Sequence, residues 1–418
     1  DPRPGHGVPP GEQDHAITET APGHSTLLSG RSPASTGIVT NGLGVADPAT
    51  RILGDPDAPG ASPARFRGSA LFDWLRAADS GSRALSVSRK DRGAILPIGR
   101  AREDVYWYVG GRWTTSDYYR ASLPSWLTAY DARSGARALA GRAWDLLLPD
   151  SAYSEPDSEP YENGGKDFLF PHRFPADSAR SVIDFPWMDS LTLDLALEGV
   201  RQLGLGRDGH TDLLSISLSS TDAVGHAYGP DSWEMHDQVL RVDRWLGQFL
   251  DSLARLVPGD SIVFALTADH GVTPYPEDLA AHHEPGGRIG LKPLVARLNA
   301  AYDHRFAMRF GFRTEAGLIY GDVAALRARG VDVDSVARAT ATEMRALDGV
   351  AEVYTPRSIA AASDADSNAG RWKRQLPDGF EWMVAGVAKA GYQWSDGTAS
   401  TSHGTTNSTD VLIPMAFW

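Results

Sequence analysis

The sequence predicts an α/β protein with an open, mostly parallel sheet and helices on both of its faces. Residues 213–218 and 261–266 are short apolar runs of the kind that form buried strands. Between them, residues 231–256 carry apolar side chains at helical spacing, and Pro258-Gly259 ends that pattern. A strand, a helix and a second strand joined by short loops are typical of a parallel βαβ unit.

Further elements extend this pattern along the chain. Residues 84–88 are strand-like, and residues 191–205 have a helical pattern that leads into the strand at 213. Residues 335–347 predict a helix with Asp334 as its N-cap, followed by a strand at 350–354. Open sheets of this class place their sites at the carboxyl ends of strands, so we expect the chemistry there.

Length alone would allow two or three domains, but we expect one catalytic domain over residues 1–418. Residues 96–185 are rich in aromatic residues, Pro and Ser, and predict a cap-like insertion. Residues 356–400 are polar and predict a second, loop-like insertion. The first residues are loop-like and the last form an apolar run, so we expect a domain that is truncated at both ends.

The composition limits the kinds of ligand and partner. The chain has 40 Lys and Arg against 53 Asp and Glu, which argues against a nucleic-acid platform and leaves anion binding to local charges. There are no cysteines, so any metal must bind His, Asp, Glu or hydroxyl oxygen. No run approaches about 18 apolar residues, so no membrane span is expected, and we find no signal-peptide pattern.

Five candidate metal ligands follow the predicted strands or precede the last apolar run. These borderline-hard donors are the type that a metal needs when it polarises phosphate oxygens. Any one pair could equally be a turn or a satisfied polar group, but the residues reinforce each other because they follow neighbouring strands. The five are Asp222, His226, Asp269, His270 and His403.

A hydroxyl-rich cluster at residues 18–26 supplies a candidate nucleophile, Thr20. A helix is expected to begin near Pro22-Gly23, and the N–H groups at a helix N-terminus favour an anion. A Thr hydroxyl is a poor nucleophile until metal coordination lowers its pKa. On composition alone, such a turn is usually only a helix cap.

These motifs resemble those of the alkaline phosphatase superfamily. Thr20-Ala-Pro-Gly-His24, followed by Gly37-Ile-Val and Asn41, is similar to the nucleophile motif of the phosphate-irrepressible alkaline phosphatases and of the nucleotide pyrophosphatase/phosphodiesterases. The resemblance covers the chain from about residue 15 onward, with the motifs in the family's order. It implies an alkaline phosphatase-like fold, a phosphothreonine intermediate on Thr20, and a phosphate-binding role for Asn41.

The resemblance also implies two Zn²⁺ ions as cofactors. The five candidate ligands and the nucleophile then divide into two sets. Zinc one takes Asp222, His226 and His403, and zinc two takes Asp269, His270 and the Thr20 oxygen.

One departure from the family concerns zinc two. The family has a further ligand, an Asp at the end of a strand upstream of the nucleophile motif. Residues 1–14 are too short and too rich in Pro and Gly for that strand, and neither Asp1 nor Asp14 has the expected setting. A metal- or phosphate-binding remnant without turnover therefore stays an alternative.

Lys90 and Arg92 distinguish between monoester and diester substrates. They lie two residues apart, so in an extended segment their side chains would point the same way. Two cations favour the additional charge of a phosphate monoester, and Arg can bind two oxygens at once. A lone Lys-x-Arg is more often a solvated loop. Here, however, Lys90-Asp-Arg-Gly93 resembles the phosphate clamp of the phosphate-irrepressible alkaline phosphatases, which the diesterases lack.

We therefore expect an alkaline phosphatase that hydrolyses phosphate monoesters, with a phosphodiesterase or nucleotide pyrophosphatase as the alternative. Its partners are small phosphate esters, and no protein partner is implied. By resemblance, the location is periplasmic or secreted. His24 is expected to be structural, packing beneath the nucleophile turn.

Overall fold

The main sheet of this computed structural model has four strands, with residues 6–7, 10–363, 365–397 and 400–418 described. Three neighbouring strands run parallel, and β5 is antiparallel at the edge. The predicted α/β class with a mostly parallel central sheet is confirmed. The spatial order is β5 (Arg112–Thr114), β4 (Asp104–Val109), β3 (Ala84–Ser88) and β8 (Leu213–Ser217).

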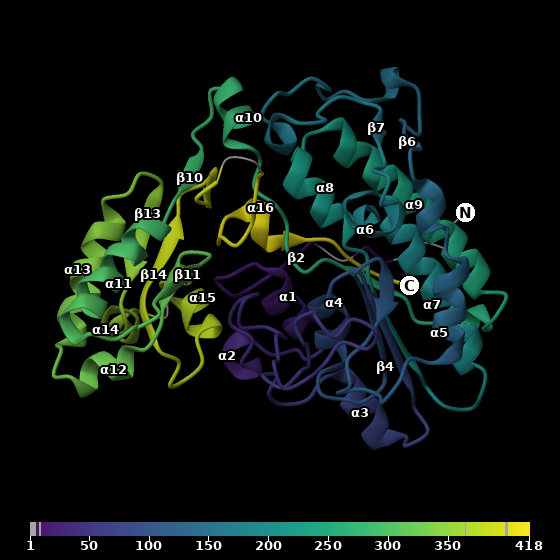
Figure 1. The fold of residues 1–418 in the computed structure, drawn as a ribbon, viewed down its shortest axis with the longest axis horizontal. Helices are drawn as coiled ribbons and strands as arrows, with labels where there is room; N and C mark the ends of the chain where they lie inside the picture. Colours follow the sequence, from purple (N-terminus) through teal and green to yellow (C-terminus); the bar gives the residue numbers. More distant parts are fainter. Residues whose placement is uncertain (1–5, 8–9, 364, 398–399) are drawn as a thin grey trace.

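Both faces of this sheet are covered, as the alternation along β4 shows. Tyr106 and Tyr108 face the core that includes helices α7 (Trp187–Leu203) and α9 (Trp233–Leu253). Val105 and Trp107 belong to the core on the opposite face. This period of two places the N-terminal elements and α7 on opposite sides of the sheet (Figure 1).

The close approach of α7 to the sheet depends on a glycine. A Cβ at Gly199 would lie 2.4 Å from Leu85 Cδ2, so no larger residue fits between α7 and β3 without a shift. The helices predicted at 191–205 and 231–256 are present as α7 and α9, with slightly different ends.

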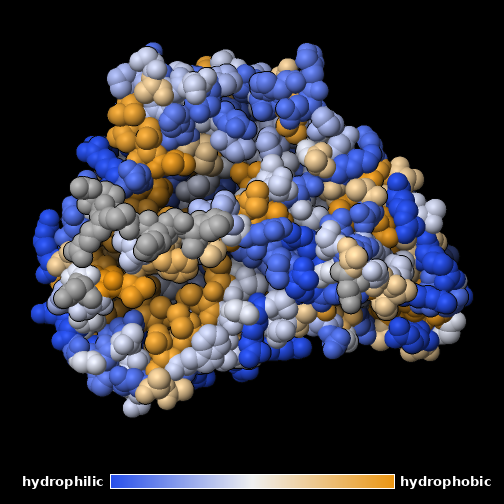
Figure 2. Space-filling model, turned by 180° about the vertical axis from the view of Figure 1, so that it is seen from behind, coloured by the Kyte–Doolittle hydropathy of each residue, from blue (hydrophilic) through white to orange (hydrophobic). Residues whose placement is uncertain are grey.

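The second predicted strand of the βαβ unit is shorter than expected. Only β9 (Ala265–Thr267) pairs, and its partner is the antiparallel β17 (Met415–Phe417), which also pairs with β1 (His6–Gly7). Among the described residues, β8 pairs only with β3, so β8 and β9 do not hydrogen-bond to each other. Val263, which precedes β9 in the predicted strand, is 89% exposed. Hydrophobic side chains gather on the reverse face of the molecule (Figure 2).

A second, antiparallel sheet has its own core. Its order is β11 (Arg313–Glu315), β12 (Leu318–Tyr320), β14 (Trp382–Ala388) and β13 (Val350–Tyr354). Helices α11 (Lys292–Phe306), α12 (Val323–Ala328) and α13 (Val333–Arg345) contribute to this core. The predicted strand at 350–354 therefore exists but joins this sheet, which lies apart from the parallel one (Figure 1).

The N-cap of α13 is Asp332 and not Asp334, because the Asp332 side chain accepts the N–H of Ser335. Residues 356–400 include α14 (Pro356–Ala361), α15 (Ser367–Gln375), β14 and β15 (Tyr392–Trp394), so this segment is more regular than a loop.

Residues 96–185 contribute both to the main sheet and to a covering layer. β4 and β5 belong to the sheet, and α5 (Ser125–Arg133), β6 (Ala143–Trp144) and β7 (His172–Arg173) follow. Trp113 and Trp144 are fully buried, consistent with a packing role for these aromatic residues.

The remaining named helices and strands are short. No described helix combines the length and the apolar character that a membrane crossing requires. These elements are α1 (Thr20–Leu27), α2 (Pro33–Thr36), α3 (Leu71–Ala78), α4 (Asp91–Ile95), α6 (Ser178–Ser181), α8 (Ser220–Tyr228), α10 (Pro276–Ala281), α16 (Ser408–Val411), β2 (Gly11–Glu12), β10 (Gly287–Ile289) and β16 (Leu412–Ile413).

Candidate active site

The segments that follow β3, β8 and β9 meet at one end of the main sheet. Because β3 and β8 are parallel, their carboxyl ends lie at the same edge, where α4 and α8 begin. α1 and the segment before α16 complete the site. The structure connects eight of the nine predicted site residues through direct contacts or close charges: Thr20, Lys90, Arg92, Asp222, His226, Asp269, His270 and His403. The ninth, Asn41, contacts Ala21, the residue after Thr20.

Asp222 is surrounded by three imidazoles. Its Oδ1 lies 3.5 Å from His403 Nε2 and 3.6 Å from both His226 Nε2 and His270 Nε2. The rings of His270 and His403 are stacked, with centroids 3.6 Å apart. Three ring nitrogens therefore approach one carboxylate oxygen.

Backbone carbonyls determine the tautomer of each imidazole. A carbonyl only accepts, so the contacting Nδ1 carries the proton and the neutral ring keeps a lone pair on Nε2. Burial lowers the pKa of His226 and of His403, which favours the neutral form. The Nδ1 partners are Thr401 O at 2.8 Å for His226, Thr18 O at 2.7 Å for His403, and Gly271 O at 2.9 Å for His270.

This arrangement suits a metal cation. Asp222, His226 and His403 each offer one ligand atom, and these atoms all lie within 4.8 Å of one another. Lone pairs that face a carboxylate oxygen repel it unless a positive charge lies between them. Burial would raise the pKa of Asp222, but the ammonium of Lys90 outweighs it and holds that pKa well below its usual range. The ionised carboxylate and neutral imidazoles could therefore hold a metal ion.

A second set of donors lies beside the first. His270 Nε2 is 3.4 Å from Asp269 Oδ2 and 3.5 Å from Thr20 Oγ1. Burial opposes the charge on Asp269, but neighbouring groups, among them the Nδ1–H of His24 at 3.1 Å, outweigh it and hold the pKa of that carboxyl well below its usual range. His24 Nδ1 lies 2.9 Å from Thr20 O and 3.1 Å from Asp269 Oδ2, so it ties the nucleophile turn to this carboxylate.

The nucleophile turn packs directly against Asp269. α1 begins at Thr20, slightly earlier than the sequence predicts, and Thr20 is buried. A Cβ at Gly23 would lie 2.4 Å from Asp269 O and 2.9 Å from Asp269 Cβ. The glycine of the motif therefore allows the first turn of α1 to approach the second donor set.

Lys90 connects Thr20, the candidate nucleophile, to the first donor set. Its Nζ lies 3.4 Å from Thr20 Oγ1 and forms an ion pair with Asp222 Oδ2. Arg92 Nε is buried and has no hydrogen-bond partner among the described residues, so the protein leaves this donor unsatisfied. The expectation that Lys90 and Arg92 share an extended segment is wrong, because α4 begins between them at Asp91.

Asn41 contacts the start of α1 through its side chain. Its Oδ1 accepts the N–H of Ala21 at 2.8 Å, which leaves the Nδ2 hydrogens as donors. The Ala21 N–H is therefore occupied by Asn41 and does not face a phosphoryl oxygen in this arrangement. The Asn41 backbone N–H in turn donates to Glu19 Oε2 at 2.9 Å.

Sequence reasoning missed two acidic residues at the site. Glu19 directly precedes the nucleophile, and burial together with nearby Glu315 raises the pKa of Glu19 to about 8. Glu315, on β11, accepts the N–H of Gly42 at 2.9 Å. Glu19 lies within the hydroxyl-rich cluster at residues 18–26, and this position was a sequence signal for a role at the site. No local motif marks Glu315.

The acidic residues considered near the N-terminus do not complete the second donor set. Asp14 is exposed and pairs with Arg374 at 3.1 Å. Asp1 lies outside the described residues. Among the described residues, Asp269, His270 and Thr20 therefore have no further carboxylate from this segment.

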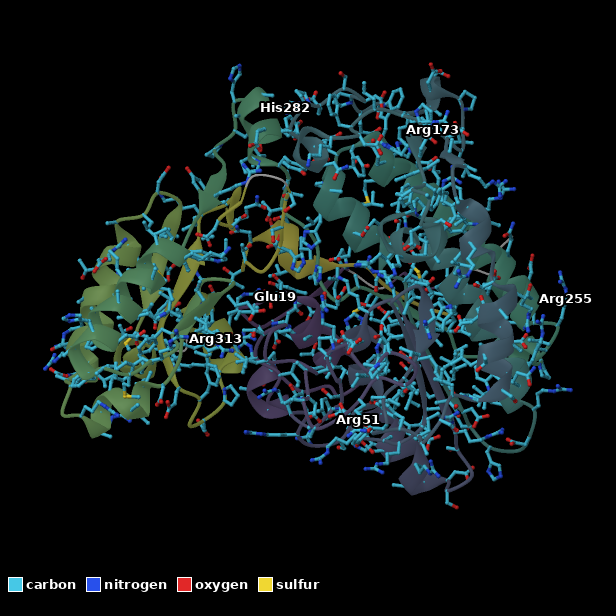
Figure 3. The ribbon with its side chains drawn as sticks, in the orientation of Figure 1. Glu19, Arg51, Arg173, Arg255, His282 and Arg313 are labelled. Atoms are coloured by element: carbon cyan, nitrogen blue, oxygen red, sulfur yellow. The ribbon has the colours of Figure 1, made fainter. Side chains whose placement is uncertain are left out.

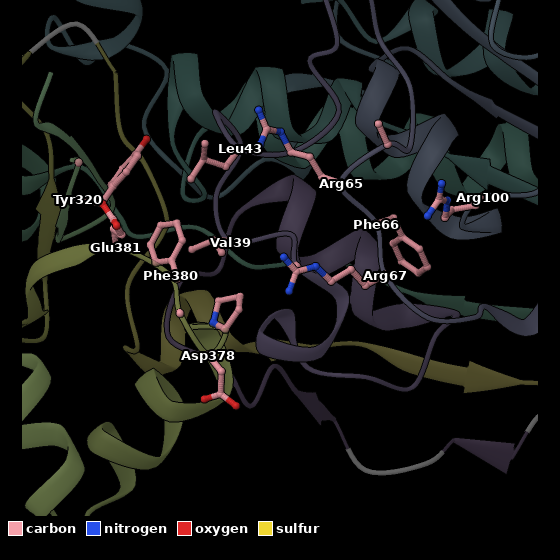
Figure 4. Close-up of a pocket in the computed structure, with 15 residues that line it drawn as sticks. Val39, Leu43, Arg65, Phe66, Arg67, Arg100, Tyr320, Asp378, Phe380 and Glu381 are labelled. Carbon is pink, nitrogen blue, oxygen red and sulfur yellow. The ribbon is translucent and has the colours of Figure 1, made fainter. Parts of the chain in front are cut away.

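A separate groove of about 620 Å³ lies beside residues 39–43, the loop that contains the candidate phosphate ligand Asn41. Val39 and Leu43, on either side of Asn41, line it together with Arg65, Arg67 and residues of the antiparallel-sheet region. Figure 4 shows Tyr320, Phe380 and Glu381 on one side and the arginines on the other. None of the nine predicted site residues lines this groove.

The comparisons with known proteins establish the family of this chain. A sequence model of the family "Type I phosphodiesterase / nucleotide pyrophosphatase" matches residues 5–360. The chain belongs to this family, and the resemblance to the alkaline phosphatase superfamily is confirmed.

Two similar proteins carry the name alkaline phosphatase. Alkaline phosphatase PhoV of Synechococcus elongatus is 31% identical over 96% of this chain and 76% of its own length. Alkaline phosphatase PafA of Elizabethkingia meningoseptica is 28% identical over 97% of this chain and 78% of its own. A crystal structure of PafA covers 99% of this chain and 84% of its own, with 26% identity and a TM-score of 0.90. The prediction of an alkaline phosphatase-type hydrolase is confirmed at this level.

Proposed function

We propose that this protein hydrolyses phosphate monoesters through a phosphothreonine intermediate on Thr20. The observation that carries the proposal is the cation Lys90 beside Thr20, with a second cation, Arg92, close to Lys90. Lys90 Nζ lies 3.4 Å from Thr20 Oγ1, and the buried Arg92 Nε lacks a partner among the described residues. Positive charge of this kind matches the dianionic phosphoryl group of a monoester. The alkaline phosphatase names of similar proteins support the same activity.

We also propose that the two donor sets hold two Zn²⁺ ions, because a mixture of imidazole and carboxylate ligands suits zinc. Asp222, His226 and His403 would hold one ion, and Asp269, His270 and Thr20 the other. Bound zinc would supply positive charge that lowers the pKa of a coordinated hydroxyl and stabilises negative oxygens.

The residues of this chain then have distinct roles. The Thr20 oxygen attacks phosphorus, the bond to the leaving oxygen breaks, and the phosphoryl group is carried on Thr20 until water displaces it. The Asn41 amide, Lys90 and Arg92 hold the phosphoryl oxygens. Most of the catalysis in such transfers comes from positioning and charge stabilisation. His24 holds the Thr20 backbone and Asp269 in place.

Two alternatives have specific observations behind them. The family name includes phosphodiesterases, so a diester could be the preferred substrate. The second donor set receives no carboxylate from Asp14, so a chain that binds metal or phosphate without turnover is the other alternative. We further propose small phosphate esters as partners and a periplasmic or secreted location, both on resemblance to alkaline phosphatases.

Turnover of an aryl phosphate monoester and of the matching bis-aryl diester tests the proposal. Phosphate release, zinc content and covalent phosphate on Thr20 after acid quenching should be measured on the same preparation. We expect a monoester preference in the wild-type chain and no turnover in Thr20→Ala, with the zinc of the first donor set retained. Near-normal activity of Thr20→Ala would remove Thr20 from its role. Zinc binding without turnover would favour the inactive alternative.

A further inference from the structure

The loop that carries Asn41 is held by two acidic side chains. Glu19 Oε2 accepts the N–H of Asn41 at 2.9 Å, and Glu315 Oε1 accepts the N–H of Gly42 at 2.9 Å. Consecutive backbone amides of this loop are therefore fixed by two acidic side chains.

The two acids come from different parts of the fold. Glu19 lies directly before the nucleophile, and Glu315 ends β11 of the antiparallel sheet. Figure 3 shows Glu19 at the junction between the N-terminal elements and the region of Arg313, which also belongs to β11. The pair thus joins the antiparallel sheet to the nucleophile turn.

The fit around this pair is tight. A Cβ at Gly42 would lie 2.8 Å from Glu315 Oε2, so a larger residue at position 42 would require the Glu315 carboxyl group to shift. Tyr320 OH lies 3.4 Å from Glu315 Oε2 and supports the same carboxyl group. Glu19 is buried, so its carboxyl group has little freedom to bind water instead.

Holding the backbone also orients the Asn41 side chain. The Oδ1 atom is bound to Ala21 N–H, and the remaining Nδ2 hydrogens can point only where the loop backbone directs them. We propose that Glu19 and Glu315 are positioning residues that hold Asn41 so that its amide nitrogen faces the phosphoryl group. This proposal rests on the phosphate-binding role of Asn41 in the proposed function.

A double-mutant cycle between Glu315 and Asn41 tests the proposal. The readouts are the Kd for inorganic phosphate, by calorimetry on metal-loaded protein, and kcat/KM for an aryl phosphate. We expect Glu315→Ala to weaken both by about tenfold, equivalent to about 1.4 kcal/mol. In an Asn41→Ala background the same change should have less than about a threefold effect, because Asn41 no longer has an amide to position.

Two further variants separate positioning from general stability. Glu315→Gln keeps an oxygen that can accept the Gly42 N–H and should restore phosphate affinity to within about threefold. Glu381→Ala removes an exposed carboxylate of the same region, which accepts the N–H of Ala324 at 3.1 Å, and should leave both readouts unchanged.

Each outcome has a defined meaning. Equal losses from Glu315→Ala with and without Asn41, or lower thermal stability with unchanged phosphate affinity, would overturn the proposal. Failure of the proposed function is recognised separately, as wild-type protein that binds phosphate but releases none from a monoester. The coupling between Glu315 and Asn41 is still read from the phosphate Kd in that case.

Discussion

Lys90 and the three imidazoles bind opposite oxygens of Asp222. Lys90 Nζ pairs with Oδ2, whereas the Nε2 atoms of His226, His270 and His403 approach Oδ1 at 3.5–3.6 Å. The ammonium can therefore stay on one side of the carboxylate while a metal lies on the other. Lys90 contributes both to Asp222 and to the environment of Thr20, so its removal affects more than one function.

Removal of Arg92 is for this reason the cleaner test of substrate class. Arg92→Ala removes a cation that, apart from Asp91 at 3.5 Å, has no ion-pair partner among the described residues. A charge-assisted hydrogen bond contributes about 1.5–3 kcal/mol, and about 1.4 kcal/mol corresponds to a factor of ten. We expect kcat/KM for a monoester to fall about ten- to a hundredfold and kcat/KM for the diester to fall much less.

Lys90→Ala provides the comparison. It should lower both activities, because Asp222 loses its partner, and it should also change metal affinity. Parallel losses of monoester and diester activity in Arg92→Ala would mean that Arg92 supports the site without selecting the monoester. If neither the monoester nor the diester activity changes, the diesterase alternative becomes the better interpretation.

Metal removal should abolish turnover. The donor sets combine neutral imidazoles with ionised carboxylates, a ligand set that suits Zn²⁺, whereas Mg²⁺ prefers oxygen ligands. After chelation and removal of the chelator, added Zn²⁺ should restore more activity than Mg²⁺ at equal free concentration. His403→Ala, which removes one member of the first donor set, should lower the zinc content measured by elemental analysis. Full activity in protein shown to contain no metal would contradict the two-zinc proposal.

Gly23→Ala should separate the nucleophile turn from Asp269. The new Cβ would lie 2.4 Å from Asp269 O, a distance that forces the turn or the carboxylate to move. Misplacement by about 1 Å at a reacting group can cost about a hundredfold in rate, so we expect a loss of that order in kcat/KM. Gly247→Ala, on α9 with no atom within 4 Å of the new Cβ, is the matched control. Equal activities of the two variants would refute the role given to Gly23.

Glu162 should make stability depend on pH. Burial, with a further contribution from Glu234, raises the pKa of Glu162 from 4.5 to about 9. Above about pH 4.5 the unfolded state releases this proton, whereas the folded state still holds it. The contribution of Glu162 to the free energy of unfolding is therefore fully present below that pH. It is lost as the pH rises toward 9.

Glu162→Gln tests this dependence because the amide cannot ionise. The urea midpoint of the variant should fall less than that of the wild type between pH 5 and pH 9, a range that lies between the ordinary pKa of 4.5 and the shifted pKa of about 9. Glu284→Gln, at an exposed position, should follow the wild-type curve. If the urea midpoint of Glu162→Gln falls with pH as steeply as that of the wild type, another group causes the pH dependence.

Local sequence determined the two long helices of the main core and the candidate residues of the site. Periodicity at 191–205 and 231–256 depends on neighbours within a few turns, so α7 and α9 were predictable. The motif around Thr20 and the pairs after β8 and β9 were recognisable for the same reason, because each consists of residues close together in the chain.

Tertiary structure alone decided how these pieces combine. Whether β9 pairs with β8 or with β17 depends on contacts between distant segments, and so does the antiparallel placement of β13. The division of Asp222 between Lys90 and three imidazoles, and the approach of Glu315 to Gly42, likewise bring together residues that are far apart in sequence. Patterns of 2 and 3.6 residues indicate which face of an element is buried, but not which partner covers it.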